Sequence, residues 1–65
     1  MRNIDKLAKK FGLEEYVDFK IELGSIYISD EDDFGRKFWL HFAETLGYRG
    51  DTAEMMKDIK NALNK

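Results

Sequence analysis

The sequence predicts a small α+β protein whose elements follow in the order α-β-β-α-α. Apolar residues recur at helical spacing near both ends of the chain, whereas apolar and polar residues alternate between residues 16 and 28 in the manner of β-strands. A length of 65 residues, without proline, linker or repeat, predicts a single compact domain over residues 1–65. We expect one antiparallel β-hairpin packed on a central aromatic-rich helix, because an isolated hairpin is not stable in water.

The composition is typical of a folded chain without covalent cross-links. One Trp, three Tyr and five Phe supply large side chains for the core, and the chain contains no Cys. The net charge of −2 gives the whole molecule no strong preference for nucleic acid or for an acidic membrane. Since no apolar run is long enough for a membrane span or a signal peptide, we expect a cytoplasmic protein without membrane contact.

The first predicted helix is short and amphipathic. Its apolar face collects Ile4, Leu7, Ala8 and Phe11 at the spacing i, i+3, i+4 and i+7. Lysines take the opposite face. We expect Asn3 as the N-cap and Gly12 as the residue that stops the helix.

The next segment changes to a period of two, which predicts a β-hairpin. Its first strand places on one face Val17, Phe19, Ile21 and Leu23. Gly24 and Ser25 have the composition of a two-residue type II′ turn. Such a turn pairs Leu23 with Ile26 and Ile21 with Ile28, so the apolar residues of both strands share one face.

Residues 30–46 are predicted to form the central helix. Four consecutive acids, Asp30 to Asp33, lie where the positive end of a helix dipole attracts carboxylates. The apolar side chains that follow cover about half of a helical projection; they are Phe34, Phe38, Trp39, Phe42, Ala43 and Leu46. So broad an apolar surface predicts contact with the hairpin on one flank and with another helix on the other, and Gly47 is the expected stop.

The last predicted helix has Asp51 or Thr52 as its N-cap and runs to the end of the chain. Glu54 lies three residues after Asp51, which is the spacing of a capping box. The expected buried stripe consists of Met55, Met56, Ile59, Ala62 and Leu63.

No arrangement of residues in the sequence predicts catalysis or a metal site. Asp30, Asp32 and Gly35 match three positions of a calcium-binding loop, but Phe34 and His41 stand where that loop needs oxygen ligands. His41 is the only His, and neither a thiol nor a glycine-rich phosphate motif is present. We therefore expect no enzymatic activity, no cofactor, no metal and no catalytic residue.

Residues that the predicted core does not need are candidates for contact with a partner. Leu40 projects away from the apolar arc of the predicted central helix, and tyrosine and arginine are common in binding hot spots. The candidate partner-binding residues are Tyr16, Tyr27, Lys37, Leu40, Tyr48 and Arg49. We expect a small regulatory protein that engages a partner protein as a monomer or weak homodimer, a class that includes regulators and inhibitors encoded by phages and mobile elements.

DNA binding is the main alternative function. The stretch from the hairpin through "FAETLGYRGDTAEMMKDIKNAL" resembles the N-terminal domains of phage Bro-type antirepressors in its predicted order of elements and in Leu46-Gly47-Tyr48. The resemblance implies a DNA-binding or antirepressor-like module. The cations available for phosphates are Arg2 with the lysines of the first helix, or Arg36, Lys37, Arg49 and Lys57.

A third hypothesis assigns a role to the hairpin or to the acidic segment. Asp18, Glu22 and residues 30–33 would together form an acidic strip that imitates nucleic acid. The hairpin also has two free edges through which two copies of the chain would pair as a homodimer.

Overall fold

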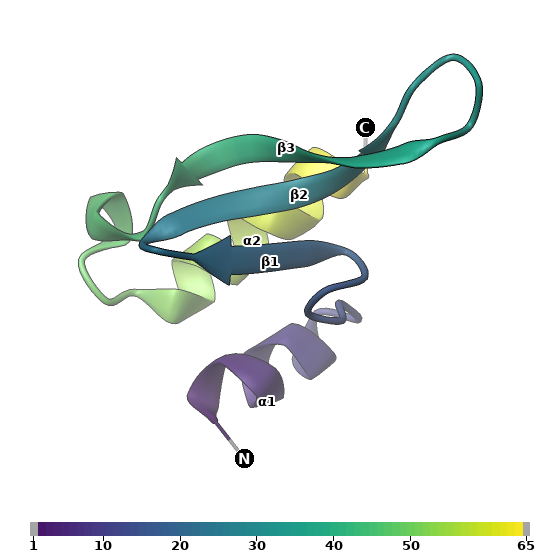
Figure 1. Cartoon of the computed structure of the whole chain (residues 1–65). Coiled ribbons are helices and arrows are strands. Elements are labelled where there is room, and N and C mark those ends of the chain that lie inside the picture. The colour runs from purple at the N-terminus through teal and green to yellow at the C-terminus, as the bar shows by residue number, and fades with distance from the viewer. Residues whose placement is uncertain (1, 65) are drawn as a thin grey trace.

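The computed structural model describes residues 2–64, which form an α+β domain with a three-stranded antiparallel sheet of strand order β1-β2-β3. The elements in chain order are α1 (Asn3–Lys10), β1 (Phe19–Glu22), β2 (Ser25–Glu31), β3 (Lys37–Glu44), the short 3₁₀ helix η1 (Thr45–Tyr48) and α2 (Thr52–Leu63). In Figure 1, α2 crosses behind the sheet, and α1 lies beyond β1 at the side of the sheet. The predicted α+β class is confirmed.

The predicted central helix is wrong, because residues 37–44 form the third strand. The Phe34, Phe38 and Phe42 spacing of four residues fits one face of a helix, but it fits one side of a strand equally well. Leu40 distinguishes the two: it falls outside the helical arc, yet it lies between Phe38 and Phe42 on a strand and pairs with Ile28. The aromatic residues of this segment also have high β-propensity.

The four acids do not start a helix, because Asp30 and Glu31 end β2 and Asp32 and Asp33 begin the turn between β2 and β3. The Asp32 carboxylate accepts hydrogen bonds from the backbone N–H of Phe34 and of Arg36, both at 2.9 Å, and from Arg36 Nε at 3.1 Å. These contacts, chiefly the one from the Arg36 backbone, hold the pKa of the Asp32 carboxyl below its usual range. Gly35 follows with a positive φ of 79°, which suits glycine.

The β1–β2 hairpin has Phe19 and Ile21 on the predicted apolar face, but Val17 and Leu23 lie outside β1 and are exposed, and the turn and register differ from the prediction. Phe19 pairs with Ile28 and Ile21 pairs with Ile26, so the predicted pairing is wrong by two positions. A shift of two keeps every side chain on its face, whereas a shift of one would reverse them all. The turn consists of Leu23 and Gly24, with φ values of 49° and 79°, and positive values at both central positions are typical of a type I′ turn.

Replacing Leu23 by asparagine is expected to raise the free energy of unfolding by about 1 kcal/mol. The Leu23 side chain is 105% exposed and therefore contributes nothing to the core, while its left-handed backbone favours Asn over Leu. Urea denaturation measures the change. Leu46→Asn is the matched control, because Leu46 is also exposed but has no positive φ; an equal gain at both positions would contradict the turn assignment.

The core lies between the sheet and the helices. Its buried members are Ala8, Leu13, Phe19, Ile26, Ile28, Met55, Met56 and Ile59. The predicted apolar face of α1 is confirmed, since Ala8 is buried and Ile4, Leu7 and Phe11 pack against the core. Gly12 stops this helix with a φ of 73°, as predicted, whereas the N-cap position is Arg2 and not Asn3.

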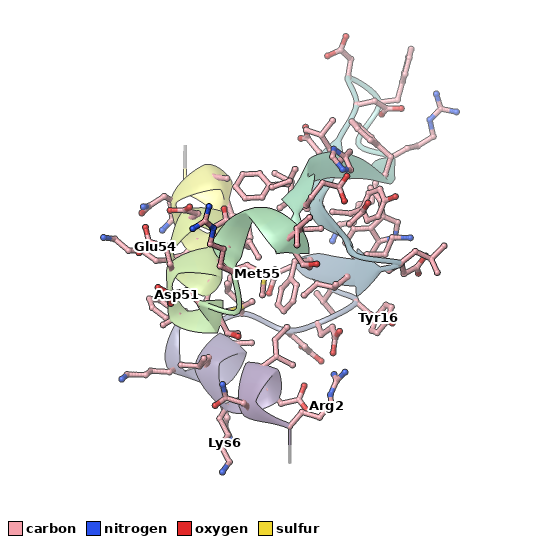
Figure 2. All side chains as sticks on the ribbon, turned by 90° about the vertical axis from the view of Figure 1, so that its left-hand side faces the viewer. Arg2, Lys6, Tyr16, Asp51, Glu54 and Met55 are labelled. Atoms are coloured by element: carbon pink, nitrogen blue, oxygen red, sulfur yellow. The ribbon has the colours of Figure 1, made fainter. Side chains whose placement is uncertain are left out.

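Helix α2 has the predicted N-cap and buried stripe, but it packs directly on the sheet, where a central helix was predicted. The Asp51 carboxylate caps its start by accepting the Glu54 N–H at 3.1 Å. Met55, Met56 and Ile59 are buried, and Figure 2 shows Met55 between α2 and the rest of the fold. With α2 behind the sheet and α1 beyond β1, no helix among the described residues covers the other side of the sheet.

Candidate protein-binding surface

One face of the sheet is covered by no helix of residues 2–64. Phe19, Ile26 and Ile28 point to the core, so the residues between them in the strands point the other way. The pairs Lys20–Tyr27, Tyr27–His41 and Ser29–Trp39 lie on this opposite side. We call the surface formed by Lys20, Tyr27, Trp39 and His41 the open face.

The side chains of the open face hold one another in place. Lys20 Nζ lies 5.1 Å from the ring centre of Tyr27 and 5.3 Å from that of Trp39, within the range of cation–π attraction. The lysine side chain is only 18% exposed and also pairs with Glu22 at 3.4 Å. Tyr27 meets His41 edge to face, with ring centres 5.5 Å apart and planes at 81°. The open face is therefore a preorganised aromatic surface.

A β-bulge adds a carboxylate to the open face. Ile26 pairs with Ala43 and Tyr27 with His41, so Phe42 has no partner of its own on β2. The extra residue brings Glu44 to the same side as His41, and Glu44 Oε1 lies 3.0 Å from His41 Nε2. Ser25 Oγ donates to the other carboxylate oxygen at 2.9 Å. The Ser25 hydrogen bond and then that of His41 lower the pKa of the Glu44 carboxyl.

Beside the open face lies a shallow recess of about 260 Å³ in which two predicted contact residues meet. It is lined by Tyr16, Val17, Ser29, Lys37, Phe38 and Trp39. Tyr16 is well exposed, and Figure 2 shows it on the side of the sheet away from α2. Of the six predicted contact residues, Tyr16, Tyr27 and Lys37 thus gather around Trp39.

Leu40 lies on the opposite side of β3 from the open face. It is 44% exposed and borders a second recess with Phe42 and with Ala62 and Leu63 near the end of α2. The predicted exposure is present, but the geometry behind the prediction, an outward position on a helix, is wrong.

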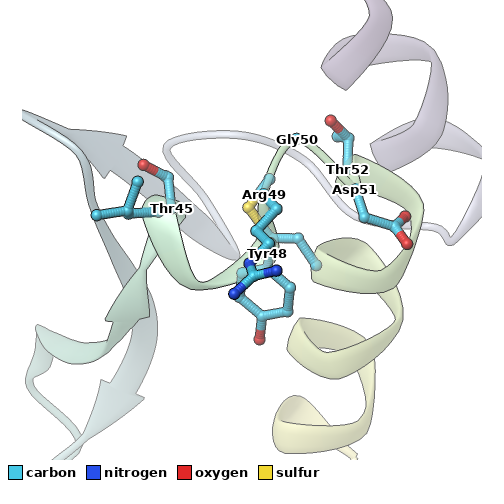
Figure 3. A pocket seen from close by; sticks show the side chains of 8 residues that line it. Thr45, Tyr48, Arg49, Gly50, Asp51 and Thr52 are labelled. Atoms are coloured by element: carbon cyan, nitrogen blue, oxygen red, sulfur yellow. The ribbon is translucent and has the colours of Figure 1, made fainter.

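Tyr48 and Arg49 lie elsewhere, at the end of η1 and in the connection to α2. They line a pocket of about 500 Å³ together with Thr45, Thr52 and Met55 (Figure 3). The ring of Tyr48 packs against the core, and its hydroxyl donates to Asp58 Oδ2 at 2.9 Å. The structure does not bring this pair to the open face.

Tyr48 is expected to make the protein less stable at alkaline pH. Burial and the Asp58 carboxylate raise the pKa of Tyr48 from 10.0 to about 12. Because the folded pKa is the higher one, the stabilisation is complete below the unfolded value and is lost as the pH rises toward 12. The free energy of unfolding should fall with pH across this interval, and Tyr48→Phe should reduce the slope. An unchanged slope in the variant would contradict this assignment.

Within residues 2–64, no group of three His, Asp or Glu side chains is arranged to hold a metal ion. The same part of the chain contains no helix that is both long and apolar enough to cross a membrane.

Comparison of the chain with protein-family models, with curated proteins and with solved structures finds no match. The likeness to Bro-type antirepressor domains required a helix between the hairpin and Leu46, and β3 occupies that position. The order of elements on which that resemblance depended is therefore wrong.

Three residues of the open face were missed as candidates: Lys20, Trp39 and His41. A signal for two of them exists in the sequence, since Lys37, Trp39 and His41 alternate with Phe38, Leu40 and Phe42. That alternation has the period of a strand and places Trp39 and His41 together on one side.

Proposed function

We propose that the protein acts by binding a partner protein through the open face and that it has no catalytic activity of its own. The observation that carries this proposal is the ordered cluster of Lys20, Tyr27 and Trp39 on a sheet face that no helix of residues 2–64 covers. Trp and Tyr are enriched in the hot spots of protein interfaces. Because the cluster is already held by internal contacts, binding would cost little side-chain entropy.

The charges around the open face support a protein partner with basic groups. The Lys20 ammonium is paired with Glu22, and Glu44 lies at the edge of the aromatic cluster. The exposed acids at the end of β2 and in the following turn, Asp30, Glu31 and Asp33, extend the negative charge beyond Trp39. Carboxylates at these positions would repel nucleic acid phosphates but would suit lysine or arginine at the rim of a partner's apolar patch.

The surface of the protein is large enough for a specific interface. A standard complex buries about 800 Å² on each partner. The chain exposes 4793 Å² in all, so an interface of this size would take about one sixth of its surface.

Replacing Trp39 by alanine is expected to weaken partner binding by about 2 kcal/mol or more, roughly thirtyfold in Kd. A photoreactive residue at Ser29, which lies between Tyr27 and Trp39 on the open side, would first mark the partner covalently in the native host. Titration with that purified partner then gives the affinity of each variant. Leu46→Ala, an exposed residue outside the open face, should bind like the original protein.

The proposal fails if Trp39→Ala binds the marked partner as tightly as the original chain does. It also fails if the protein instead binds duplex DNA with a steep salt dependence that is lost on charge reversal of Lys6, Lys9 and Lys10. These exposed lysines of α1 carry the alternative, DNA-binding function.

A further inference from the structure

β3 is the sheet's exposed edge strand, and the direction of its backbone groups follows from the ladder. Ser29 N donates to Asp18 O at 2.9 Å, on the β1 side, so Ser29 does not bond toward its β3 neighbour Trp39. Asp32 N donates to Arg36 O at 3.0 Å, so the hydrogen-bonded pairs begin at Arg36, just before the third strand, and continue at every second residue. Because antiparallel ladders alternate, Phe38 and Leu40 bond to β2, and Lys37, Trp39 and His41 point their N–H and C=O groups outward.

The β3 edge has Lys37 at its start and a bulge at Phe42, but residues 38–41 between them carry no Lys, Arg, Asp or Glu to discourage pairing. The strand is eight residues long, and the chain contains no proline to interrupt it. Apolar side chains stand on both of its sides, with Trp39 36% exposed on one side and Phe38 and Leu40 each 44% exposed on the other. The opposite edge, β1, has four residues, and its Phe19 C=O already accepts a hydrogen bond from Tyr16 N.

We propose that β3 pairs antiparallel with β3 of a second copy, so that two chains form one continuous six-stranded sheet. The strand is complementary to itself in charge, since it begins with Lys37 and ends with Glu44. Antiparallel pairing brings Lys37 of each copy near the His41–Glu44 pair of the other. A strand from an unrelated protein would have to supply the same order of charges.

The β-bulge fixes the register of this dimer. The regular part of the edge runs from Lys37 to His41, because the ladder is irregular at Phe42, and Trp39 is the midpoint of that stretch. A two-fold axis at Trp39 places Phe38 of one copy beside Leu40 of the other, which covers both half-exposed side chains. The dimer uses the edge and leaves the open faces side by side, so it does not depend on the proposed function.

Two measurements on the full chain test the dimer. Sedimentation equilibrium over a wide range of protein concentration should show the mass rising to twice that of the monomer. Amide hydrogen exchange at Trp39 and His41 should slow at least tenfold as the dimer forms, whereas exchange at Phe38 and Leu40 should already be slow in the monomer. A monomer at every concentration, or a dimer in which exchange at Trp39 and His41 is unaltered, would overturn the proposal.

Lys37→Pro separates backbone pairing from side-chain association. The N–H of Lys37 points to the edge, so proline at this first strand position removes no bond to β2. The variant should dimerise at least tenfold more weakly than Lys37→Ala, which loses the same charge but keeps the N–H. Equal dimerisation by the two variants would exclude a backbone ladder between copies. If the proline variant folds poorly, amide hydrogen exchange in the original protein still tests whether the two β3 strands pair.

Discussion

Replacing Phe19 by alanine is expected to lower the free energy of unfolding by about 3–5 kcal/mol. Phe19 begins β1, is fully buried and packs opposite Ile28, so the truncation leaves a cavity between the sheet and the helices. A domain of this length has a total stability of roughly 3–10 kcal/mol. The variant should therefore be largely unfolded at moderate urea concentrations, as circular dichroism would show.

Val17→Ala is the matched control for Phe19→Ala. Val17 lies two residues earlier and was predicted to share the apolar face, but it is 48% exposed. Its truncation should change the free energy of unfolding by about 0.5 kcal/mol or less. Similar losses of free energy of unfolding at the two positions would mean that the core extends beyond Phe19 to Val17.

Replacing Met56 by alanine is expected to cost about 2–5 kcal/mol. Met56 is fully buried on α2, the helix that crosses behind the sheet (Figure 1). Loss of its side chain removes packing on which the covered face of the sheet depends. Urea denaturation measures the change, and the two-state fit should keep the slope of the original protein.

Lys57→Ala tests whether the effect belongs to the buried stripe of α2. Lys57 follows Met56 directly but is exposed, so its replacement should leave the free energy of unfolding within about 0.5 kcal/mol. If Lys57→Ala lost as much free energy of unfolding as Met56→Ala, the face of α2 that packs against the sheet would be a different one from that described.

The two terminal helices were predictable because local signals decide them. Ala8 and Met56 lie on stripes of clear helical period, and Asp51 and Gly12 are strong boundary residues. The alternation in the first hairpin correctly placed Phe19, Ile26 and Ile28 toward the core, but it wrongly included Val17 and Leu23. The prediction of its turn was wrong because Leu23 adopts a left-handed conformation that leucine disfavours.

The third strand was missed because its aromatic spacing fits both a strand and a helix, and other features of the segment favoured a helix. Four acids followed by Phe34, Phe38 and Phe42 satisfy a helix dipole and a helix face together. The competing evidence was the placement of Leu40 in line with Phe38, and the high β-propensity of the segment. Pairing with β2 decides between a helix and a strand for residues 37–44. The partners in β2 lie outside that segment, so its own pattern does not show the pairing.

The open face could not be assembled without the third strand. Lys20 comes from β1, Tyr27 from β2, and Trp39 and His41 from β3, so their contacts depend on the register of both ladders. The bulge that joins His41 to Glu44 depends on a single extra residue. Neither register nor bulge has a reliable signature in one sequence.

Nuclear Overhauser contacts between α-protons test the strand assignment of residues 37–44 most directly. In the sheet, Ser29 faces Trp39 and Tyr27 faces His41 as non-hydrogen-bonded pairs, whose α-carbons lie only about 4.5 Å apart. We predict strong cross-peaks between the α-protons of both pairs. Their absence, with strong contacts between successive amide protons from Lys37 to Glu44, would show a helix and contradict the three-stranded sheet and its open face.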